Sequence, residues 1–368
     1  MKGFRIPVLC LVVLFAVSVA GAATSEGLTS LKSGKAALQS AGVLSFGPDA
    51  ILFVGDSQGA KVFALDTADR DAGSGKVSVA GINEKVAAML GTAADQILIN
   101  DMAVNPISKK IYLSVSRGRG PDATPVIVRV NSAGKIEELA LDNINHDSVE
   151  IANAPGADAK DRRGDSLRLQ SITDLAYVDG KVFIAGLSNE EFSSTLRSVN
   201  FPFNAADRGS SVEIFHGNHG RWETNSPVRT FVPYEIQAET NLLAAYTCTP
   251  LVKFPVAQLK PGTKVVGTTI AELGNRNRPL DMIVYKQGGV DQLLMSNSAR
   301  GVMKMSMKDI GGYGAITARV EEEKRGLPYE TIESLQGIEQ LDRLDEANAV
   351  ILARAESGSL DLRTIPLP

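Results

Sequence analysis

Cysteine is scarce in this chain, which excludes a fold held together by disulfides. Only two cysteines are present. Cys10 lies in an N-terminal apolar run that we expect to be removed, so Cys248 has no partner for an internal disulfide. Aromatic residues make up 5% of the chain and Trp222 is the only tryptophan, so no aromatic platform for a carbohydrate is evident. The fold must therefore be stabilised by its hydrophobic core, and the 34 glycines suit strands joined by tight turns.

Blocks of basic residues and several familiar enzyme motifs are also missing. The formal net charge is −4 and no cluster of Lys and Arg stands out, which argues against a nucleic-acid partner or an anionic membrane surface. The sequence contains no phosphate-binding loop, no dinucleotide fingerprint, no Gly-x-Ser-x-Gly elbow and no Cys-x-x-Cys-His haem motif. These absences exclude many common enzyme classes, but they do not exclude a hydrolase that uses scattered carboxylates.

Residues 1–22 have the pattern of a secretory signal peptide. Lys2 and Arg5 give a positive start, residues 8–19 are apolar, and small residues lead to Ala22. A membrane anchor is the alternative, but the apolar run is too short to span about 30 Å of hydrocarbon, and no later stretch is apolar enough for insertion. We expect cleavage after Ala22 and a periplasmic or secreted protein. Its net charge would change from −4 to −6, because two basic residues leave.

A strand–turn–strand sequence motif occurs three times, and each copy begins with an aspartate. The copies begin at Asp101, Asp174 and Asp281. Repeats longer than a hairpin and shorter than a domain are typical of solenoids and propellers. A two-sheet sandwich is the alternative. The aspartates occupy the same position in each copy of the motif, which favours the propeller. We predict that residues 23–368 form one all-β domain, a six-bladed β-propeller of four-stranded antiparallel blades.

The spacing of the predicted strands places the inner strands of the six blades near residues 42, 101, 173, 229, 280 and 337. Residues 76–80 are expected to form the outer strand of the first blade. The sixth blade lacks a fourth strand, which residues 24–31 could supply to close the ring. In this spacing of strands the chain resembles the six-bladed propeller superfamily that includes NHL-repeat and SMP-30/gluconolactonase-like proteins. The resemblance implies the fold, and fold alone does not imply function.

The longest loops are predicted to gather on the face where the inner strands start. Loops on a rigid scaffold commonly carry binding residues, and arginine forks bind carboxylates or phosphates. The alternative is that these arginines pair with acidic residues in solvated networks. The predicted ligand-binding residues are Arg117, Arg119, Asn189, Arg276, Arg278, Asn297 and Arg300.

The three repeated aspartates could hold Ca²⁺ or another divalent cation in the central channel. Oxygen ligands suit such ions, so Asp101, Asp174 and Asp281 are the predicted metal residues. The alternative, which the repetition favours, is that each aspartate accepts hydrogen bonds from backbone N–H groups at its strand entry. The resemblance to the SMP-30 group implies a Glu, Asn and Asp ligand set, for which Glu339 is the best candidate for the glutamate.

His216 and His219 form the only histidine pair, in a turn expected on the opposite face. Zinc normally takes three or four ligands, and His146 and Cys248 belong to other loops, so we interpret the pair as an ordinary turn. Cys248 has no histidine nearby in sequence to act as its base, which favours a packed thiol over a nucleophile.

We therefore expect an exported, non-catalytic binding protein that presents its loop-rich face to a small molecule or an envelope protein. The alternative from another class is a metal-dependent lactonase or esterase-like hydrolase, with a cation in the central channel that polarises the ester carbonyl and activates water. A structural module of an envelope assembly is a third possibility. Neither nucleic acid nor membrane insertion is expected.

Overall fold

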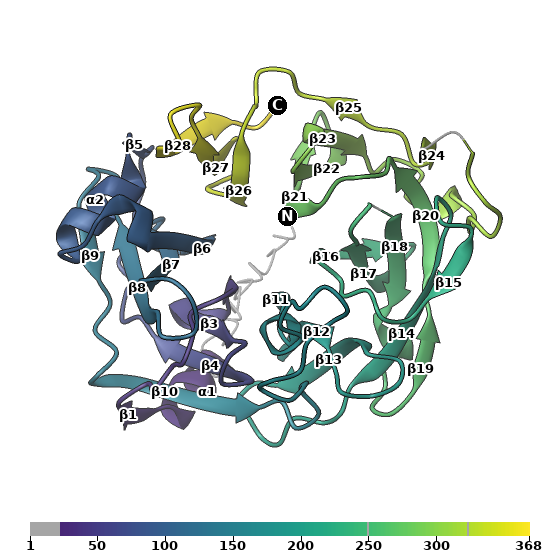
Figure 1. The fold of residues 1–368 in the computed structure, drawn as a ribbon. Coiled ribbons are helices and arrows are strands. Elements are labelled where there is room, and N and C mark those ends of the chain that lie inside the picture. Colours follow the sequence, from purple (N-terminus) through teal and green to yellow (C-terminus); the bar gives the residue numbers. More distant parts are fainter. Residues whose placement is uncertain (1–22, 249, 322–323) are drawn as a thin grey trace, which may run out of the picture.

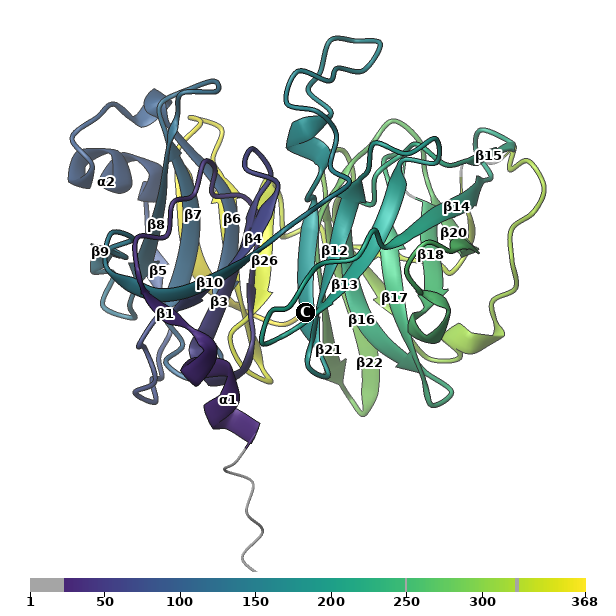
Figure 2. The same ribbon diagram turned by 90° about the horizontal axis from the view of Figure 1, so that it is seen from below.

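Six mostly antiparallel sheets surround a central axis in the computed structural model, which describes residues 23–248, 250–321 and 324–368 (Figure 1). The prediction of a six-bladed β-propeller is confirmed. Viewed from the side, the sheets stand upright around the axis and one long loop projects from a single face (Figure 2). The predicted signal peptide lies outside the described residues. Within them, no helix has the length and apolar character needed to cross a bilayer.

Blades I to III follow one another in sequence except for one strand. Blade I contains β2 (Leu44–Phe46), β3 (Ile51–Asp56), β4 (Lys61–Asp66), β10 (Ile144–Glu150) and β1 (Lys32–Gly34). Blade II contains β6 (Ile97–Val104), β7 (Ile111–Arg117), β8 (Thr124–Val130) and β9 (Ile136–Glu138). Blade III contains β11 (Asp174–Val178), β12 (Lys181–Leu187), β13 (Ser194–Asn200), β14 (Ser210–His216) and β15 (Arg221–Glu223).

Blades IV and VI take their outermost strands from distant parts of the chain, and the outermost strand of blade V follows that of blade IV. Blade IV contains β16 (Thr230–Ile236), β17 (Glu239–Ala245), β18 (Pro250–Pro255), β20 (Thr268–Leu273) and β24 (Lys324–Gly326), and β19 (Lys264–Val266) runs parallel to β14. Blade V contains β21 (Pro279–Gln287), β22 (Val290–Asn297), β23 (Gly301–Ser306) and β25 (Glu330–Thr331). Blade VI contains β26 (Ile338–Arg343), β27 (Asn348–Arg354), β28 (Leu360–Pro366) and β5 (Ser78–Val79).

The helices are few and lie outside the sheets. The α-helices are α1 (Ala23–Ser30) and α2 (Ile82–Met89). Short 3-10 turns are η1 (Pro48–Ala50), η2 (Ala94–Gln96), η3 (Arg168–Gln170), η4 (Val256–Gln258) and η5 (Ile310–Gly312). Helix α2 leads from β5 toward blade II. Its N-cap is Gly81 in the left-handed region rather than Asn83, whose side-chain oxygen instead accepts a hydrogen bond from the Leu360 N–H at 2.8 Å.

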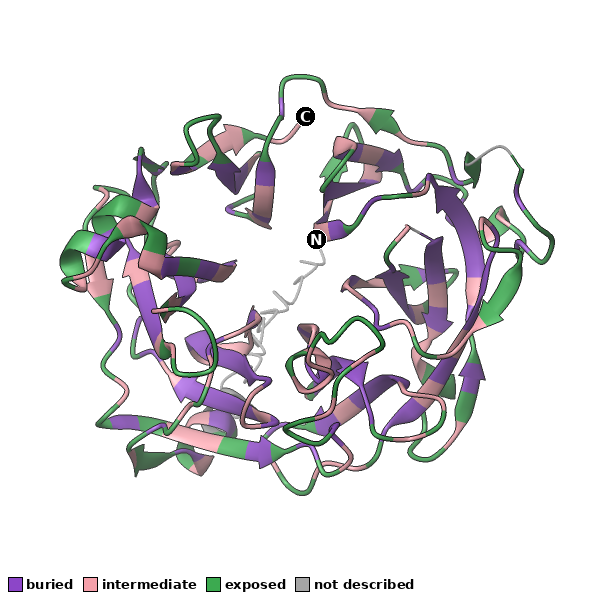
Figure 3. Ribbon diagram, viewed as in Figure 1, coloured by how far each residue is buried: buried purple, intermediate pink, exposed green. Residues whose placement is uncertain are grey.

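Each junction between blades contains its own hydrophobic core. Successive side chains of a strand point to opposite faces, so a central strand buried on both faces serves two neighbouring blades. In β3, Leu52 and Val54 pack toward blade II, whereas Ile51 and Phe53 pack toward blade III. Figure 3 shows the resulting burial of the middle strands around the ring. These cores carry most of the stabilisation, because burial of an aliphatic or aromatic side chain contributes roughly 1.5–3 kcal/mol.

The order of blades around the ring differs from their order in the chain. The hydrophobic cores join blade I to both II and III, and join blade II to VI. Around the wheel the blades therefore run II, I, III, IV, V, VI, as Figure 1 shows. After strands β1 to β4 of blade I the chain passes to blade VI as β5, builds blade II, and returns across blade I as β10.

Two predicted outer strands are therefore wrong. Residues 76–80 were assigned to blade I, but β5 pairs with β28 and completes blade VI, where Val79 lies opposite Leu362. Residues 24–31 were expected to complete blade VI, but α1 occupies that region. Outer strands of two or three residues carry too little alternation to specify a partner, so the sequence pattern locates inner strands better than outer ones.

Replacement of Val79 by aspartate is expected to weaken closure of the ring. Val79 is buried in the core between blades II and VI, so a buried charge and a lost aliphatic contact should lower the free energy of unfolding by about 3 kcal/mol. Ser78→Asp is the matched control, because Ser78 is the exposed neighbour in β5 and should change stability by less than about 0.5 kcal/mol. Urea titration of both variants measures the difference, and equal losses would contradict a closing role for Val79.

A missed strand also corrects the position of the histidine turn. Strand β13 lies within residues 188–210 and pairs with β12 along its whole length. The turn between β14 and β15 is therefore the fourth hairpin connection of the blade rather than the third. Because every hairpin reverses the chain, His216 and His219 lie on the face that carries the starts of the inner strands, contrary to the prediction.

Candidate active site in the central channel

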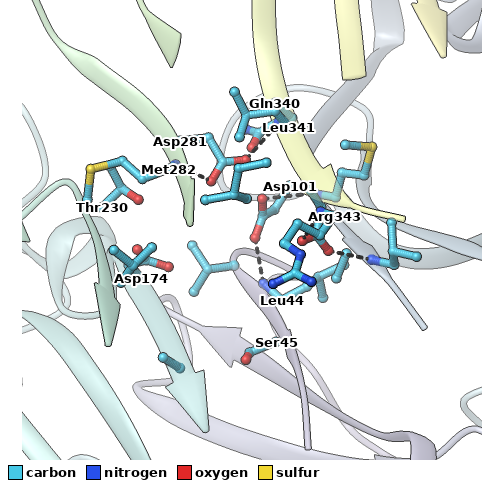
Figure 4. Close-up of a pocket in the computed structure, with 18 of the residues that line it drawn as sticks. Leu44, Ser45, Asp101, Asp174, Thr230, Asp281, Met282, Gln340, Leu341 and Arg343 are labelled. Atoms are coloured by element: carbon cyan, nitrogen blue, oxygen red, sulfur yellow. Dashed lines mark hydrogen bonds between the residues drawn. The ribbon is translucent and has the colours of Figure 1, made fainter. Parts of the chain in front are cut away.

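The inner strands of all six blades surround a pocket of about 1000 Å³. It contains the three predicted metal residues Asp101, Asp174 and Asp281, together with Asp342 (Figure 4). These side chains come from β6, β11, β21 and β26, so the repeated motif places one aspartate at an equivalent depth in three blades.

Each aspartate links its own strand to the inner strand of a neighbouring blade by accepting hydrogen bonds from both. The carboxylate of Asp101 accepts hydrogen bonds from the Met102 N–H at 2.8 Å and from the Leu44 N–H of β2 at 2.6 Å. The same two-sided arrangement recurs at Asp174 with Leu175 and Phe231, at Asp281 with Met282 and Leu341, and at Asp342 with Arg343 and Val104. The structural role that the repetition favoured is therefore present, and it extends across blades.

These bonds join the blades in pairs. Asp101 links blade II to I, Asp174 links III to IV, and Asp281 links V to VI. Asp342 adds a link from VI to II. Each oxygen of the four carboxylates already accepts one backbone N–H, so the aspartates are fixed in place before any ligand arrives.

Gln340 takes the place of the aspartate in the inner strand of blade VI. Irregular pairing just before Asp101, Asp281 and Gln340 brings these three residues into equivalent positions. With its nitrogen turned to the channel, the Gln340 amide donates to Asp101 Oδ1 and Asp281 Oδ2, each at 3.0 Å. In the opposite orientation of the amide, Gln340 Nε2 donates to the Asn100 carbonyl at 3.3 Å, and the amide oxygen lies next to the two carboxyl groups.

The same irregular pairing overturns the choice of Glu339. The inner strand of blade VI was expected to present Glu339 to the channel. The shifted register turns this residue outward, where it pairs with Arg354, and the second contact from Arg354 Nη2 to Glu339 Oε2 is 2.9 Å. Gln340 lines the pocket instead.

Burial changes the protonation of the carboxyl cluster. It raises the pKa of Asp101 to about 8 and that of Asp174 to about 7. Burial and the nearby Asp101 hold the pKa of Asp281 well above its usual range, and burial raises the pKa of Asp342 to about 6. The cluster therefore retains protons at neutral pH, while part of it is ionised.

The channel does not present a ready-made cation cage. Among the described residues, the one group of three His, Cys, Asp or Glu residues with ligand atoms within 4.8 Å of one another lies elsewhere, at His216, His219 and Glu223. The donor set of Asp101, Asp174 and Asp281 does not fit an ion bound directly by all three. A cation held through fewer carboxylates or through water stays a prediction.

Two arginines add positive charge where inner strands enter the pocket. Arg229 and Arg278 precede β16 and β21, and both line the cavity. Burial, together with the charge of Arg278, lowers the pKa of Arg229 to about 10. The hydrogen bonds of Arg229 go to the neutral side chains of Gln170 at 3.2 Å and Thr247 at 3.1 Å. An anionic group of a ligand would relieve the repulsion between the two guanidinium groups.

The other predicted ligand residues do not line the pocket. Arg117, Arg119, Arg276 and Asn189 are exposed on the surface, and Arg119 donates to the carbonyls of Asp95 and Ile97. Asn297 is buried and donates to Asn277 at 3.1 Å, and Arg300 donates to the Asn275 carbonyl at 3.2 Å. Of the seven predicted residues, only Arg278 lines this cavity.

Sequence reasoning missed several residues that do line the pocket. These are Lys109, Arg229, Gln340, Asp342 and Arg343. A signal existed for Arg229, which stands at the predicted start of an inner strand. Asp342 lies two positions after Gln340, on the same face of β26, and could have been found by following the period of two. Nothing in the sequence marks Gln340 as the substitute for an aspartate, because the irregular pairing is a structural feature.

No family model and no curated protein sequence matches this chain. Solved structures match over most of its length. A putative oxidoreductase (glucose dehydrogenase) of Thermus thermophilus has 12% identity, a TM-score of 0.35, and coverage of 91% of this chain and 100% of its own. The PQQ-bound aldose sugar dehydrogenase of Streptomyces coelicolor has 10% identity, a TM-score of 0.37, and coverage of 91% and 96%. The native arabinanase of Bacillus subtilis has 13% identity, a TM-score of 0.34, and coverage of 73% and 93%.

This comparison corrects the expectation of a non-catalytic binding protein. The three solved structures named above are enzymes, and none of them is named as a binding protein. At such low identity and TM-score they carry no information about substrate or chemistry. What the chain does must be argued from its own channel.

Proposed function

We propose that the protein is an exported hydrolase whose active site is the central channel. Its substrate class is a small ester or lactone that bears a carboxylate or phosphate group. The observation that carries the proposal is the pair of half-buried carboxyl groups, Asp101 and Asp281, which both lie next to the Gln340 amide in a pocket of about 1000 Å³. Structural support alone needs an acceptor for backbone N–H groups, and it does not need carboxyl groups that retain protons at neutral pH.

One carboxyl group of the pair can act as the general acid and the other as the general base. Two interacting carboxyl groups do not both ionise at the same pH, so one member is protonated while the other is charged. The ionised member accepts a proton from the attacking water, and the protonated member donates to the leaving oxygen. The pKa of Asp101, raised by burial to about 8, places ionisation of one member of the pair near neutral pH, where a general acid and a general base are both effective, and burial with the nearby Asp101 holds the pKa of Asp281 well above its usual range.

The basic groups of the pocket suit an anionic substrate. Arg229 and Arg278 stand together on the face where inner strands begin, so they can receive a carboxylate or phosphate while the reacting bond lies deeper, beside Asp281. The apolar leader of residues 1–22 supports action outside the cytoplasm, on substrates of the periplasm or the medium.

Asp281→Asn should reduce kcat/KM on the best substrate of a lactone and aryl-ester panel by about 100-fold or more, because a general acid–base group typically contributes that much. Asp342→Asn is the matched control: like Asp281→Asn, it replaces one of the two oxygens that accept backbone N–H groups, but the two carboxyl groups next to the Gln340 amide are those of Asp101 and Asp281. Thermal unfolding of both variants measures the loss of structure separately from the loss of rate.

Equal rate losses in the two variants would mean that the aspartates act only as structural links. No turnover of any panel member by the wild-type protein would also count against the proposal. Loss of activity in chelator, with one metal ion per chain, would replace it by the cation-dependent alternative.

A further inference from the structure

We propose that His216, His219 and Glu223 form a site for Zn²⁺ or a similar first-row transition-metal dication, supported by Glu272 of the neighbouring blade. The site lies at the outer side of blade III, and none of its residues lines the central channel. It is independent of the proposed hydrolase function.

The hairpin between β14 and β15 brings the three ligands together. His216 ends β14 and Glu223 ends β15, while His219 lies in the turn between them. Glu223 Oε2 is 3.2 Å from His216 Nδ1, and Glu223 Oε1 is 2.7 Å from His219 Nδ1. Ligands of a tetrahedral zinc ion with bonds of about 2.0–2.1 Å lie roughly 3.3 Å apart, so small movements suffice to admit the ion.

Two buried atoms next to this group have no hydrogen-bond partner. His216 Nε2 and Glu272 Oε2 face each other at 3.9 Å, and both side chains are at least 98% buried. Buried polar atoms are rarely left unpaired, and each such case demands an explanation. When His216 Nδ1 donates its hydrogen to Glu223, Nε2 is a bare acceptor, and the Glu272 carboxyl group that it faces lies 3.9 Å away, beyond hydrogen-bond distance.

A metal ion at His216 Nδ1 gives both unpaired atoms a partner. Coordination through Nδ1 moves the ring hydrogen to Nε2, which can then donate to the Glu272 carboxylate. Histidines that bind metals almost always donate their other ring N–H to a carboxylate, a carbonyl or water, which fixes the tautomer and the ring orientation. Glu272 stands where such a supporting carboxylate is required.

Glu272 is held in position from both blades. It belongs to β20 of blade IV, and its Oε1 accepts a hydrogen bond from the Gly217 N–H of blade III at 2.6 Å. A Cβ at position 217 would lie 2.8 Å from a methyl group of Val320 and 3.1 Å from Glu272 Cγ, so only glycine allows this approach. The contact that positions Glu272 therefore depends on a glycine at the junction between blades III and IV.

The site is open to solvent on one side. His219 has 41% of its side chain exposed, and three protein ligands leave a position for water or for a further ligand. Arg221 Nε lies 3.3 Å from Glu223 Oε1, and this exposed guanidinium must turn away when the ion binds. Imidazole and carboxylate ligands favour zinc, cobalt or copper over calcium.

The test is titration of the metal-free protein with CoCl₂ and ZnCl₂. Trp222, the only tryptophan, lies between Arg221 and Glu223, so paramagnetic Co²⁺ should quench its fluorescence. We expect one Co²⁺ per chain, visible absorption bands of low coordination number, and displacement by Zn²⁺. His219→Gln and Glu223→Gln should weaken binding by about 100-fold, and Glu272→Gln by about 10- to 100-fold. His146→Gln removes the remaining histidine and should leave binding unchanged.

His219 is exposed enough for its variant to fold, which separates loss of binding from loss of structure. Metal binding of equal strength in wild type, His219→Gln and Glu223→Gln would overturn the proposal. It would also be overturned if no ion binds and nitrogen NMR shows His216 with hydrogens on both ring nitrogens at pH 7. In that case the histidine would be a cation held between Glu223 and Glu272.

Discussion

Raising the pH from 5 to 8 is expected to lower the free energy of unfolding of this protein. The cause is the aspartate cluster of the channel, whose pKa values in the folded state are about 8 for Asp101, about 7 for Asp174 and about 6 for Asp342. In the unfolded chain the same groups titrate near 3.9. Between these limits the folded state binds more protons than the unfolded state, so stability falls as pH rises.

The direction is opposite to that of ordinary ion-paired carboxylates. Asp69, for example, has a lowered pKa because hydrogen bonds from Lys110 and Ser108 outweigh its burial, so its contribution is lost only in acid. Above pH 5 such groups stay ionised in both states and add no slope. The contribution of the channel aspartates is complete below about pH 4 and is lost by about pH 8.

The expected loss between pH 5 and pH 8 is on the order of 2–4 kcal/mol. Each unit of pKa difference corresponds to about 1.4 kcal/mol, but water in the channel screens the cluster and reduces the full sum. Urea unfolding at a series of pH values measures the slope. The double variant Asp101→Asn/Asp281→Asn should be less stable at pH 5 and should show a much flatter profile. A wild-type profile that rises from pH 5 to 8 would contradict the assignment of protons to this cluster.

The inner part of the propeller could be predicted from the sequence because it repeats. The aspartates at 101, 174 and 281 sit in register, and each marks an inner strand in the structure. The outer part could not be predicted, because it depends on pairings between distant segments. Thus β5 pairs with β28 and β10 crosses back over β4, although neither strand differs in composition from one that stays in its own blade.

The candidate site, too, could be predicted from the sequence only in part. Its aspartates were identified, but Gln340 was missed because a local register shift moves Glu339 out of the channel and Gln340 into it. A one-residue shift reverses which side chains face inward, since strands have a period of two. The histidine turn was placed on the wrong face for a related reason: one unrecognised strand, β13, reverses every later connection of its blade.

Asn153→Ala is expected to destabilise the protein by about 3 kcal/mol or more, although Asn153 lies in the long crossing that joins blades I and III. Its Oδ1 accepts hydrogen bonds from Arg197 Nη2 at 2.9 Å and from Arg197 Nε at 3.2 Å. Arg197 is 1% exposed, and burial lowers its pKa to about 10. No carboxylate forms a salt bridge with it among the described residues, so Asn153 is its principal partner. Loss of that partner leaves a buried guanidinium poorly compensated.

A second variant separates the buried charge from the loop itself. In Asn153→Ala/Arg197→Met the charge is gone, and stability should recover most of what Asn153→Ala loses, because an uncompensated buried ion costs more than a packed apolar side chain. Asn143→Ala is the matched control in an exposed part of the chain, where a single bond from Ser33 is lost and the change should stay within about 0.5 kcal/mol. Guanidinium titrations give the three values. If the double variant is no more stable than Asn153→Ala, the asparagine holds the crossing through its own contacts with the Arg208 carbonyl and Glu190, rather than through Arg197.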